Sequence, residues 1–392
     1  MFSIRTYNKI SDKGLSLFPN DQYSVSENEK EPEGIVLRSH KLHGETIPKS
    51  VRAVARAGAG TNNVPVESYS EQGIVVFNSP GANANAVKEL VLAGMLLSSR
   101  GILEGLQFVS EQTQLTDAAE MSVLMEKEKK RFAGLELQGK TLGIIGLGAI
   151  GSLVADAALS LGMKVLGFDP ALSVDAAWRL SSDVERQENL QAMLPRIDYL
   201  SLHVPAIEAT KNLINSETLA LMKPQAVLLN FAREAIVDSS AVVDSLENNK
   251  LRRYICDFPE PQLIARKDVL ALPHIGASTA EAEENCAVMA VQQLRDYLEN
   301  GNIQNSVNFP ATSMPRTDGT FRLSVTNKNE SGVLSNILGV IAKHSVNVAD
   351  LVNKSRGGIA YSILDLDVLP DDELVQEICA LEQVISVRKL PS

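Results

Sequence analysis

Cysteine is scarce in this sequence, which has only Cys256, Cys286 and Cys379 among its 392 residues. The three lie far apart and include no Cys-x-x-Cys pair, so neither a disulfide framework nor a zinc site of the usual spacing is indicated. We therefore expect no metal site, and we expect reduced thiols in a cytoplasmic protein.

Long hydrophobic runs and an excess of basic residues are also missing. No stretch approaches the 18 apolar residues of a membrane-spanning helix, and residues 1–7 contain no long apolar run of the kind found in signal peptides. The chain has 37 Lys and Arg against 48 Asp and Glu, which gives a net charge of −11. Nucleic acids and anionic membranes attract basic faces, so we expect neither as a partner. An anionic substrate would need a local basic pocket.

Apolar residues are plentiful, at 44%, and they fall in short runs that alternate with helical patterns. A chain of this length predicts two or three domains. The apolar runs predict strands at 34–38, 51–55 and 73–78, and then at 142–145, 163–168, 199–203, 226–230, 254–257 and 269–273. Short apolar strands separated by helices are typical of an α/β fold with a doubly wound parallel sheet.

The most informative stretch runs from Lys140 to Gly151, where an apolar strand passes directly into glycines at 146, 148 and 151. In a dinucleotide-binding turn the first glycine permits the tight turn, the second lets the backbone approach a pyrophosphate, and the third lets the next helix pack closely. A second strand then ends at Asp169, 18 positions past Gly151. A carboxylate near this offset binds the adenosine ribose and disfavours the extra phosphate of NADP. The stretch therefore predicts NAD binding.

Polar side chains follow the carboxyl ends of the later predicted strands, where ligands bind in open α/β sheets. Oxidation of a 2-hydroxy acid needs a base near neutrality and a cation for the carboxylate, and His274 and Arg233 suit these tasks. A carboxylate that orients the histidine would also raise its pKa, and Glu260 is the candidate. Taken singly, these residues could be a strand-end histidine, a surface ion pair and a solvated loop acid; together they favour catalysis. From the residues alone, His203 is interpreted as structural.

Basic residues also follow two strands of the N-terminal region, at Arg38 and Arg56. Arg56 opens the glycine-rich turn 56–63, where backbone N–H groups and a guanidinium can converge on a carboxylate or phosphate. Ordinary surface charge is the alternative. At the other end, residues 310–319 form a predicted linker, and residues 320–392 have the βαββαβ order of a ferredoxin-like module.

Three motifs, Gly139–Gly151, Leu229–Arg233 and Pro273–Thr279, resemble those of the D-isomer-specific 2-hydroxyacid dehydrogenases, and the C-terminal module is similar to an ACT domain. The resemblance implies a Rossmann-type domain at 99–283, inserted in a smaller flavodoxin-like substrate domain at 1–98 and 284–312, followed by a regulatory domain at 318–392. The loop that carries the family's acid is contracted here to 256–261.

The resemblance also implies site residues. The expected catalytic residues are Arg233, Glu260 and His274. The expected contacts of NAD are Gly146, Gly148, Ala149, Ile150, Gly151, Asp169, His203, Val204, Pro205, Ala232, Asp257 and Gly276. The expected contacts of the substrate are Arg38, Ser39, Arg56, Gly58, Ala59 and Asn83. An amino-acid effector such as serine is expected at Asn329 and Asn347.

The implied activity is NAD-dependent oxidation of D-3-phosphoglycerate to 3-phosphohydroxypyruvate, the first step of L-serine biosynthesis, by a homodimer or homotetramer. Two alternatives stay open at this point. The same chemistry could act on another acid, such as 2-hydroxyglutarate or glyoxylate, or the chain could be an NAD(H)-sensing binding protein on the same fold.

Overall fold

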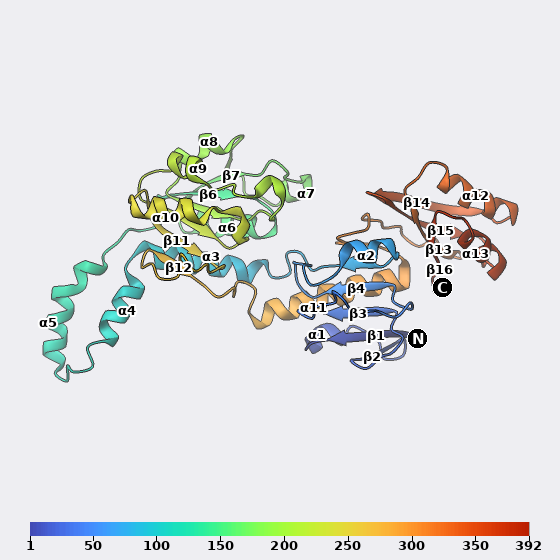
Figure 1. The fold of residues 1–392 in the computed structure, drawn as a ribbon, viewed down its shortest axis with the longest axis horizontal. Coiled ribbons are helices and arrows are strands. Elements are labelled where there is room, and N and C mark those ends of the chain that lie inside the picture. The colour runs from blue at the N-terminus through green and yellow to red at the C-terminus, as the bar shows by residue number, and fades with distance from the viewer. Residues whose placement is uncertain (392) are drawn as a thin grey trace. The chain divides into compact units, whose positions relative to one another are not determined.

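The computed structural model describes residues 1–391, without the side chain of Asp175. The chain forms two compact units (Figure 1). The first, which we call the split unit, combines Met1–Asn83 with Ala280 and the residues that follow it. The second, which we call the nucleotide unit, is Ala84–Thr279. The three-domain division expected from the sequence, with boundaries after residues 98 and 283, stays a prediction.

The nucleotide unit contains a seven-stranded parallel sheet in the order β12-β11-β10-β9-β6-β7-β8. Its strands are β6 Thr141–Ile145, β7 Lys164–Phe168, β8 Val184–Arg186, β9 Tyr199–Leu202, β10 Ala226–Asn230, β11 Leu251–Cys256 and β12 Val269–Ala271. The central strands β6, β9 and β10 are almost entirely buried, as apolar runs covered on both faces should be. The doubly wound sheet is thus confirmed, and β8 is a strand that the apolar pattern did not predict.

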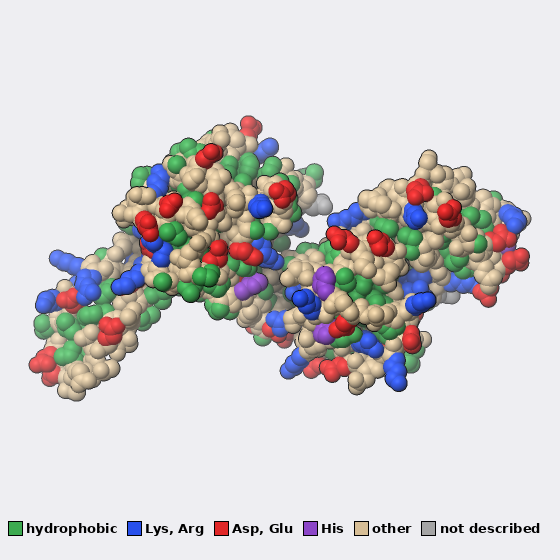
Figure 2. All heavy atoms as spheres, in the orientation of Figure 1, with side chains coloured by type: hydrophobic (Ala, Val, Ile, Leu, Met, Phe, Trp, Pro, Cys, Tyr) green, Lys and Arg blue, Asp and Glu red, His purple; other side chains and the backbone are tan. Residues whose placement is uncertain are grey.

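Helices and short 3₁₀ turns connect these strands. The α-helices are α3 Ala84–Ser99, α4 Ile102–Ser110, α5 Ala118–Glu128, α6 Ala149–Ser160, α7 Val174–Ala177, α8 Leu190–Met193, α9 Ser216–Leu221 and α10 Ser239–Glu247. The 3₁₀ turns are η1 Lys129–Phe132, η2 Leu194–Arg196, η3 Glu208–Thr210 and η4 Glu234–Ile236. The α4 and α5 helices have no fully buried residue, which fits the polar composition of residues 101–135. Figure 2 shows hydrophobic and charged side chains side by side on the surface of α4 and α5.

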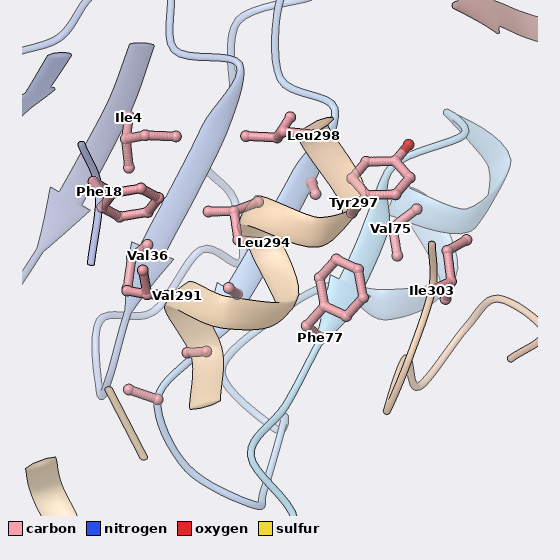
Figure 3. Close-up of a cluster of buried hydrophobic side chains, with 14 of the residues drawn as sticks. Ile4, Phe18, Val36, Val75, Phe77, Val291, Leu294, Tyr297, Leu298 and Ile303 are labelled. Carbon is pink, nitrogen blue, oxygen red and sulfur yellow. The ribbon is translucent and has the colours of Figure 1, made fainter. Parts of the chain in front are cut away.

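The split unit begins with a five-stranded parallel sheet in the flavodoxin-like order β2-β1-β3-β4-β5. Its elements are β1 Phe2–Tyr7, α1 Asp12–Leu15, β2 Tyr23–Ser26, β3 Gly34–Leu37, β4 Ala53–Arg56, α2 Val66–Glu71 and β5 Val75–Phe77. The long helix α11, Ala280–Asn300, packs its apolar face on this sheet (Figure 3). Leu294 and Tyr297 of α11 are buried in one cluster with Ile4, Val36 and Phe77. The N-terminal sheet therefore needs a helix that begins only at residue 280 to complete its core.

The C-terminal module, residues 320–391, is an antiparallel sheet in the order β14-β15-β13-β16 with two helices. Its elements are β13 Phe321–Lys328, α12 Val333–Lys343, β14 Val348–Arg356, β15 Ile359–Leu366, α13 Asp372–Cys379 and β16 Val384–Lys389. This is the βαββαβ order expected from the sequence. Tyr361 and Ile363 of β15 are buried in the same cluster as Tyr297 and Phe309. The module thus shares a core with the rest of its unit.

A buried ion pair reinforces this connection. Arg322 donates to both carboxylate oxygens of Asp365, at 2.6 and 2.8 Å, and the two side chains are 1% and 0% exposed. The same guanidinium also donates to the carbonyls of Asn300, Met314 and Pro315. Arg322 therefore ties the sheet of the C-terminal module to the end of α11 and to the linker.

None of the helices within residues 1–391 combines the length and apolar character that crossing a membrane would require. Within the same residues, no group of three or more His, Cys, Asp or Glu side chains is arranged to hold a metal ion.

Candidate active site

The glycines at 146–151, which we call the dinucleotide turn, have the close contacts that explain their spacing. Gly146 has φ +90°, and a Cβ there would lie 2.6 Å from the carbonyl oxygen of His203. A Cβ on Gly151 would lie 2.0 Å from the carbonyl oxygen of Gly146. Gly148 is the N-cap of α6, and a Cβ added to it would have no atom within 4 Å. Two glycines are thus required by packing, and Gly148 leaves open space at a helix N-terminus, where a pyrophosphate binds.

Asp169 follows β7 and faces the dinucleotide turn. One carboxylate oxygen accepts the N–H of Leu147 at 2.8 Å, and the other accepts the N–H of Ala171 at 2.9 Å. Each carboxylate oxygen has two lone pairs, so these bonds orient the group and leave capacity for ribose hydroxyls. Beside it lies a cavity of about 650 Å³, whose lining includes Leu147, Pro170 and Arg186. The residues of this region therefore fit the adenosine half of NAD.

The segment from His203 to Pro205 follows β9 and packs on the same turn. The imidazole Nε2 lies 2.8 Å from the hydroxyl of Ser201, and Nδ1 is buried without a hydrogen-bond partner in the described part of the chain. Burial lowers the pKa of His203 to about 3, so this ring is neutral at physiological pH. The interpretation of His203 as structural and its predicted contact with NAD both stay predictions.

Arg233 lies just after β10, on an exposed turn shaped by a buried asparagine. Asn230 is 0% exposed, accepts the N–H of Ala232 and donates to the carbonyl of Arg233. Arg233 itself donates to the carbonyl of Ala232 at 2.6 Å. Asn230 was not among the residues predicted from the sequence, although an asparagine at the end of an apolar strand is a signal that could have indicated it.

His274 lies in the loop after β12, and its backbone has φ +56°. A non-glycine residue in this left-handed region needs support from its surroundings. Asp257 supplies that support, because its two buried carboxylate oxygens accept the N–H groups of Ile275 at 2.8 Å and Gly276 at 2.7 Å. A Cβ on Gly276 would lie 2.9 Å from the Asp257 carboxylate, so glycine permits this close approach.

Phe258 contacts two of the three predicted catalytic side chains. Its ring centroid lies 4.7 Å from that of His274, and the Arg233 guanidinium carbon lies 5.8 Å from the same centroid. Aromatic and cation–π contacts at these distances are weakly attractive and orient the groups they join. Phe258 was not among the site residues predicted from the sequence.

Glu260 accepts a hydrogen bond from the hydroxyl of Ser239, in the first turn of α10. Within residues 1–391, no hydrogen bond or ion pair joins Glu260 to His274. The structure thus brings Arg233 and His274 to one aromatic ring, whereas the carboxylate of Glu260 is held by Ser239 through the bond to Oε1.

The predicted substrate residues lie in the split unit, where Arg38 and Arg56 follow the adjacent strands β3 and β4. Arg38 pairs with Glu283 at 2.7 Å, and Arg56 donates its Nε–H to the Arg38 carbonyl at 3.0 Å. A Cβ on Gly58, which has φ +149°, would lie 1.9 Å from the Arg56 guanidinium. Burial raises the pKa of the Cys286 thiol, and the charges of Arg56 and Arg38 oppose that rise.

The other predicted substrate and effector residues have largely backbone contacts. The N–H of Ser39 donates to Asn8, the Ala59 carbonyl accepts from Asn78, and Asn83 is half-buried. In the C-terminal module, Asn329 donates its side-chain N–H to the Gly357 carbonyl, and the Asn347 N–H donates to Asp367. These residues stay predictions for substrate and effector binding.

Sequence comparison identifies relatives of this chain. The sequence model of the family described as "D-isomer specific 2-hydroxyacid dehydrogenase, NAD binding domain" matches residues 92–276. D-3-phosphoglycerate dehydrogenase of Methanocaldococcus jannaschii is 34% identical over 290 residues, which are 72% of this chain and 52% of that protein. The chain thus spans about half the length of that relative. D-3-phosphoglycerate dehydrogenase of Haemophilus influenzae is 32% identical over 357 residues, which are 88% of this chain and 82% of that protein.

Structural comparison finds solved structures with a similar fold. The TT0316 protein of Thermus thermophilus superposes with a TM-score of 0.62 and 26% identity, covering 78% of this chain and 100% of that one. With the dinucleotide turn, Asp169 and the residues at the strand ends, these matches show that the chain belongs to the D-isomer specific 2-hydroxyacid dehydrogenase family and is an NAD-dependent enzyme of that family.

Proposed function

We propose that this enzyme oxidises D-3-phosphoglycerate to 3-phosphohydroxypyruvate with NAD, the first step of L-serine biosynthesis. The observation that carries the substrate choice is the pair Arg38 and Arg56, which follow the adjacent strands β3 and β4 on a chain of net charge −11. The Nε–H of Arg56 donates to the main-chain carbonyl of Arg38, which holds the two residues together. A phosphorylated acid needs such a local concentration of positive charge. The M. jannaschii and H. influenzae relatives are D-3-phosphoglycerate dehydrogenases, which supports the same substrate.

In the nucleotide unit, Arg233 is the proposed carboxylate-binding residue and His274 the proposed base. The guanidinium of Arg233 is exposed and can form two parallel hydrogen bonds with a substrate carboxylate. His274 removes the hydroxyl proton while the C–H bond breaks and the carbonyl forms. When bound, NAD supplies the acceptor for the hydride. Asp257 keeps the backbone of the His274 loop in place through its two N–H···O bonds.

Glu260 is proposed as the acid that orients His274. Ser239 engages Oε1 of Glu260, so Oε2 is the oxygen proposed to accept an imidazole N–H when substrate is bound. Active-site hydrogen bonds commonly tighten only in the substrate complex. A Glu260→Gln variant should then lower kcat and change the pH dependence of kcat/KM, while Ser239→Ala should have a smaller effect on both.

The test of the base is the rate of 3-phosphohydroxypyruvate reduction with NADH. His274→Ala should lower kcat about 1,000-fold, in the range expected for loss of a general acid or base. His344→Ala, in the C-terminal module, is the matched control and should keep the parent rate. Equal rates for His274→Ala and the parent would refute the proposed base.

The test of the substrate compares 3-phosphohydroxypyruvate with glyoxylate and 2-oxoglutarate. Arg56→Ala should lower kcat/KM about 10- to 100-fold for the phosphorylated acid alone, the loss of one charge-assisted hydrogen bond. Arg52→Ala, just before the same strand β4, is the control. A preference for an unphosphorylated acid in the parent enzyme would replace the proposed substrate.

Three further proposals concern assembly, regulation and location. The exposed Leu106 and Val109 of α4 and Val123 of α5 are apolar surface that a second copy would cover, which supports a homodimer or homotetramer. Sedimentation as a monomer would contradict this.

Asn329 and Asn347 are the proposed contacts of an amino-acid effector, tested by inhibition with serine. The three free cysteines favour the reducing cytoplasm.

A further inference from the structure

The exposed Trp178 lies beside the adenosine region of the nucleotide unit. It follows the short helix α7 and donates its backbone N–H to the carbonyl of Val174 at 3.0 Å. Its side chain is 84% exposed, and it is the only tryptophan of the chain. An indole is large and mostly apolar, so such exposure usually marks a surface that contacts a partner or ligand.

Trp178 lines the same cavity of about 650 Å³ as Asp169. Much of the remaining wall is apolar and includes Leu147, Leu172 and Leu180. The floor is tightly packed, because a Cβ on Gly167 would lie 2.7 Å from the side chain of Leu147. The cavity thus combines one oriented carboxylate, the side chain of Arg186, a largely apolar wall and one exposed aromatic ring.

The carboxylate determines which part of NAD this cavity can hold. Asp169 is oriented by the N–H groups of Leu147 and Ala171, and a carboxylate at this place binds the adenosine ribose. The base attached to that ribose then lies within reach of the cavity wall. Adenine is a flat aromatic ring, and it can stack its face on an aromatic side chain without any hydrogen bond between the two.

We propose that the indole of Trp178 stacks on the adenine of NAD and forms the outer wall of its site. This inference rests on NAD binding and adds to it a binding residue from outside the dinucleotide turn and the strand ends. Trp178 holds the far end of the cofactor, so it affects affinity and leaves the chemical step unchanged. The stacking also removes the exposed indole from water when NAD binds.

The first test uses the emission of the single tryptophan, which reports on position 178 alone. The full-length protein is titrated with AMP, which contains the adenosine of NAD. It is titrated separately with nicotinamide mononucleotide, which contains no adenosine. Saturable quenching by AMP and no change with the nicotinamide nucleotide are expected. If calorimetry detects AMP binding while the tryptophan emission stays constant, the proposed stacking is wrong.

The second test compares variants. Trp178→Ala should raise both the Kd of AMP and the KM of NADH about 10-fold, within the range of base–aromatic stacking, and leave kcat unchanged. Trp178→Phe, which keeps an aromatic face, should recover most of the affinity. Leu221→Ala, which truncates another exposed apolar residue of the same unit, is the control. Parent-like affinities in Trp178→Ala would overturn the inference.

The two tests also separate this inference from the assignment of NAD itself. If the parent protein binds neither NADH nor AMP by calorimetry, cofactor binding fails, and the stacking proposal fails with it. If the parent binds NADH and Trp178→Ala binds it equally well, only the role of Trp178 is refuted.

Discussion

The dinucleotide turn and the ion pair of Arg322 and Asp365 are built in opposite ways. The turn uses glycines within six consecutive residues, and its critical contacts are between backbone atoms. The ion pair joins residues 43 positions apart and gathers carbonyls from the linker and the end of α11. The turn has open space beside Gly148, where a ligand can bind, whereas both side chains of the ion pair are buried in protein. Substitutions should therefore affect ligand binding in one region and folding in the other.

The largest effect is expected from Arg322→Met. This change leaves the Asp365 carboxylate buried without its cation, which costs about 3–5 kcal/mol in comparable buried pairs. Chemical denaturation should show this loss in the free energy of unfolding. The double variant Arg322→Met with Asp365→Leu should recover much of it, because no buried charge remains. A loss below about 1 kcal/mol in the single variant would mean that the pair contributes little.

Gly151→Ala should have the next largest effect, because its Cβ would lie 2.0 Å from the Gly146 carbonyl. Overpacking of this kind costs about 1–3 kcal/mol of folding stability. The shift that relieves it also displaces the dinucleotide turn, so NADH binding should be lost. Calorimetric titration and thermal unfolding measure the two effects. Parent-like values in both would show that the turn tolerates displacement.

Gly148→Ala separates ligand binding from folding. Nothing lies within 4 Å of the added Cβ, so the stability should change by less than about 0.5 kcal/mol. The methyl group would occupy the side from which a pyrophosphate approaches, and the Kd of NADH should rise at least about 10-fold, or about 1.4 kcal/mol. A stable variant with unchanged affinity would contradict the proposed place of the pyrophosphate.

The smallest effect at ordinary pH concerns the titration of Asp365. Burial alone would raise its pKa, but hydrogen bonds from Arg322 and the Thr317 N–H hold the pKa below its usual value of 3.8. A carboxyl with a lowered folded-state pKa stabilises the fold above its unfolded pKa, and this contribution disappears as the pH falls through the folded value. Stability should thus fall below about pH 4, by at most about 1.4 kcal/mol per pH unit for this group. The double variant should show a shallower fall in acid denaturation.

Much of the fold could be predicted from local patterns. Apolar runs of four to six residues revealed six strands of the nucleotide sheet, because buried parallel strands are apolar on both faces. The strand β8, Val184–Arg186, was missed because its three residues include two exposed charges. The predicted order of strands and helices in the last 73 residues indicated the C-terminal module. Only the structure shows that Tyr361 of this module is buried in one cluster with residues of α11.

The sequence by itself determined the dinucleotide turn and Asp169, because glycine spacing and a strand-end acid act over short stretches of backbone. Only the tertiary structure decided what surrounds the predicted catalytic residues: Phe258 between Arg233 and His274, and Ser239 on Glu260. These contacts join segments that follow different strands. Phe258 and Glu260 both lie in the contracted loop 256–261, so the length of that loop affects which side chains they contact. Local geometry can be inferred from residue order, whereas contacts between distant loops depend on how the whole sheet packs.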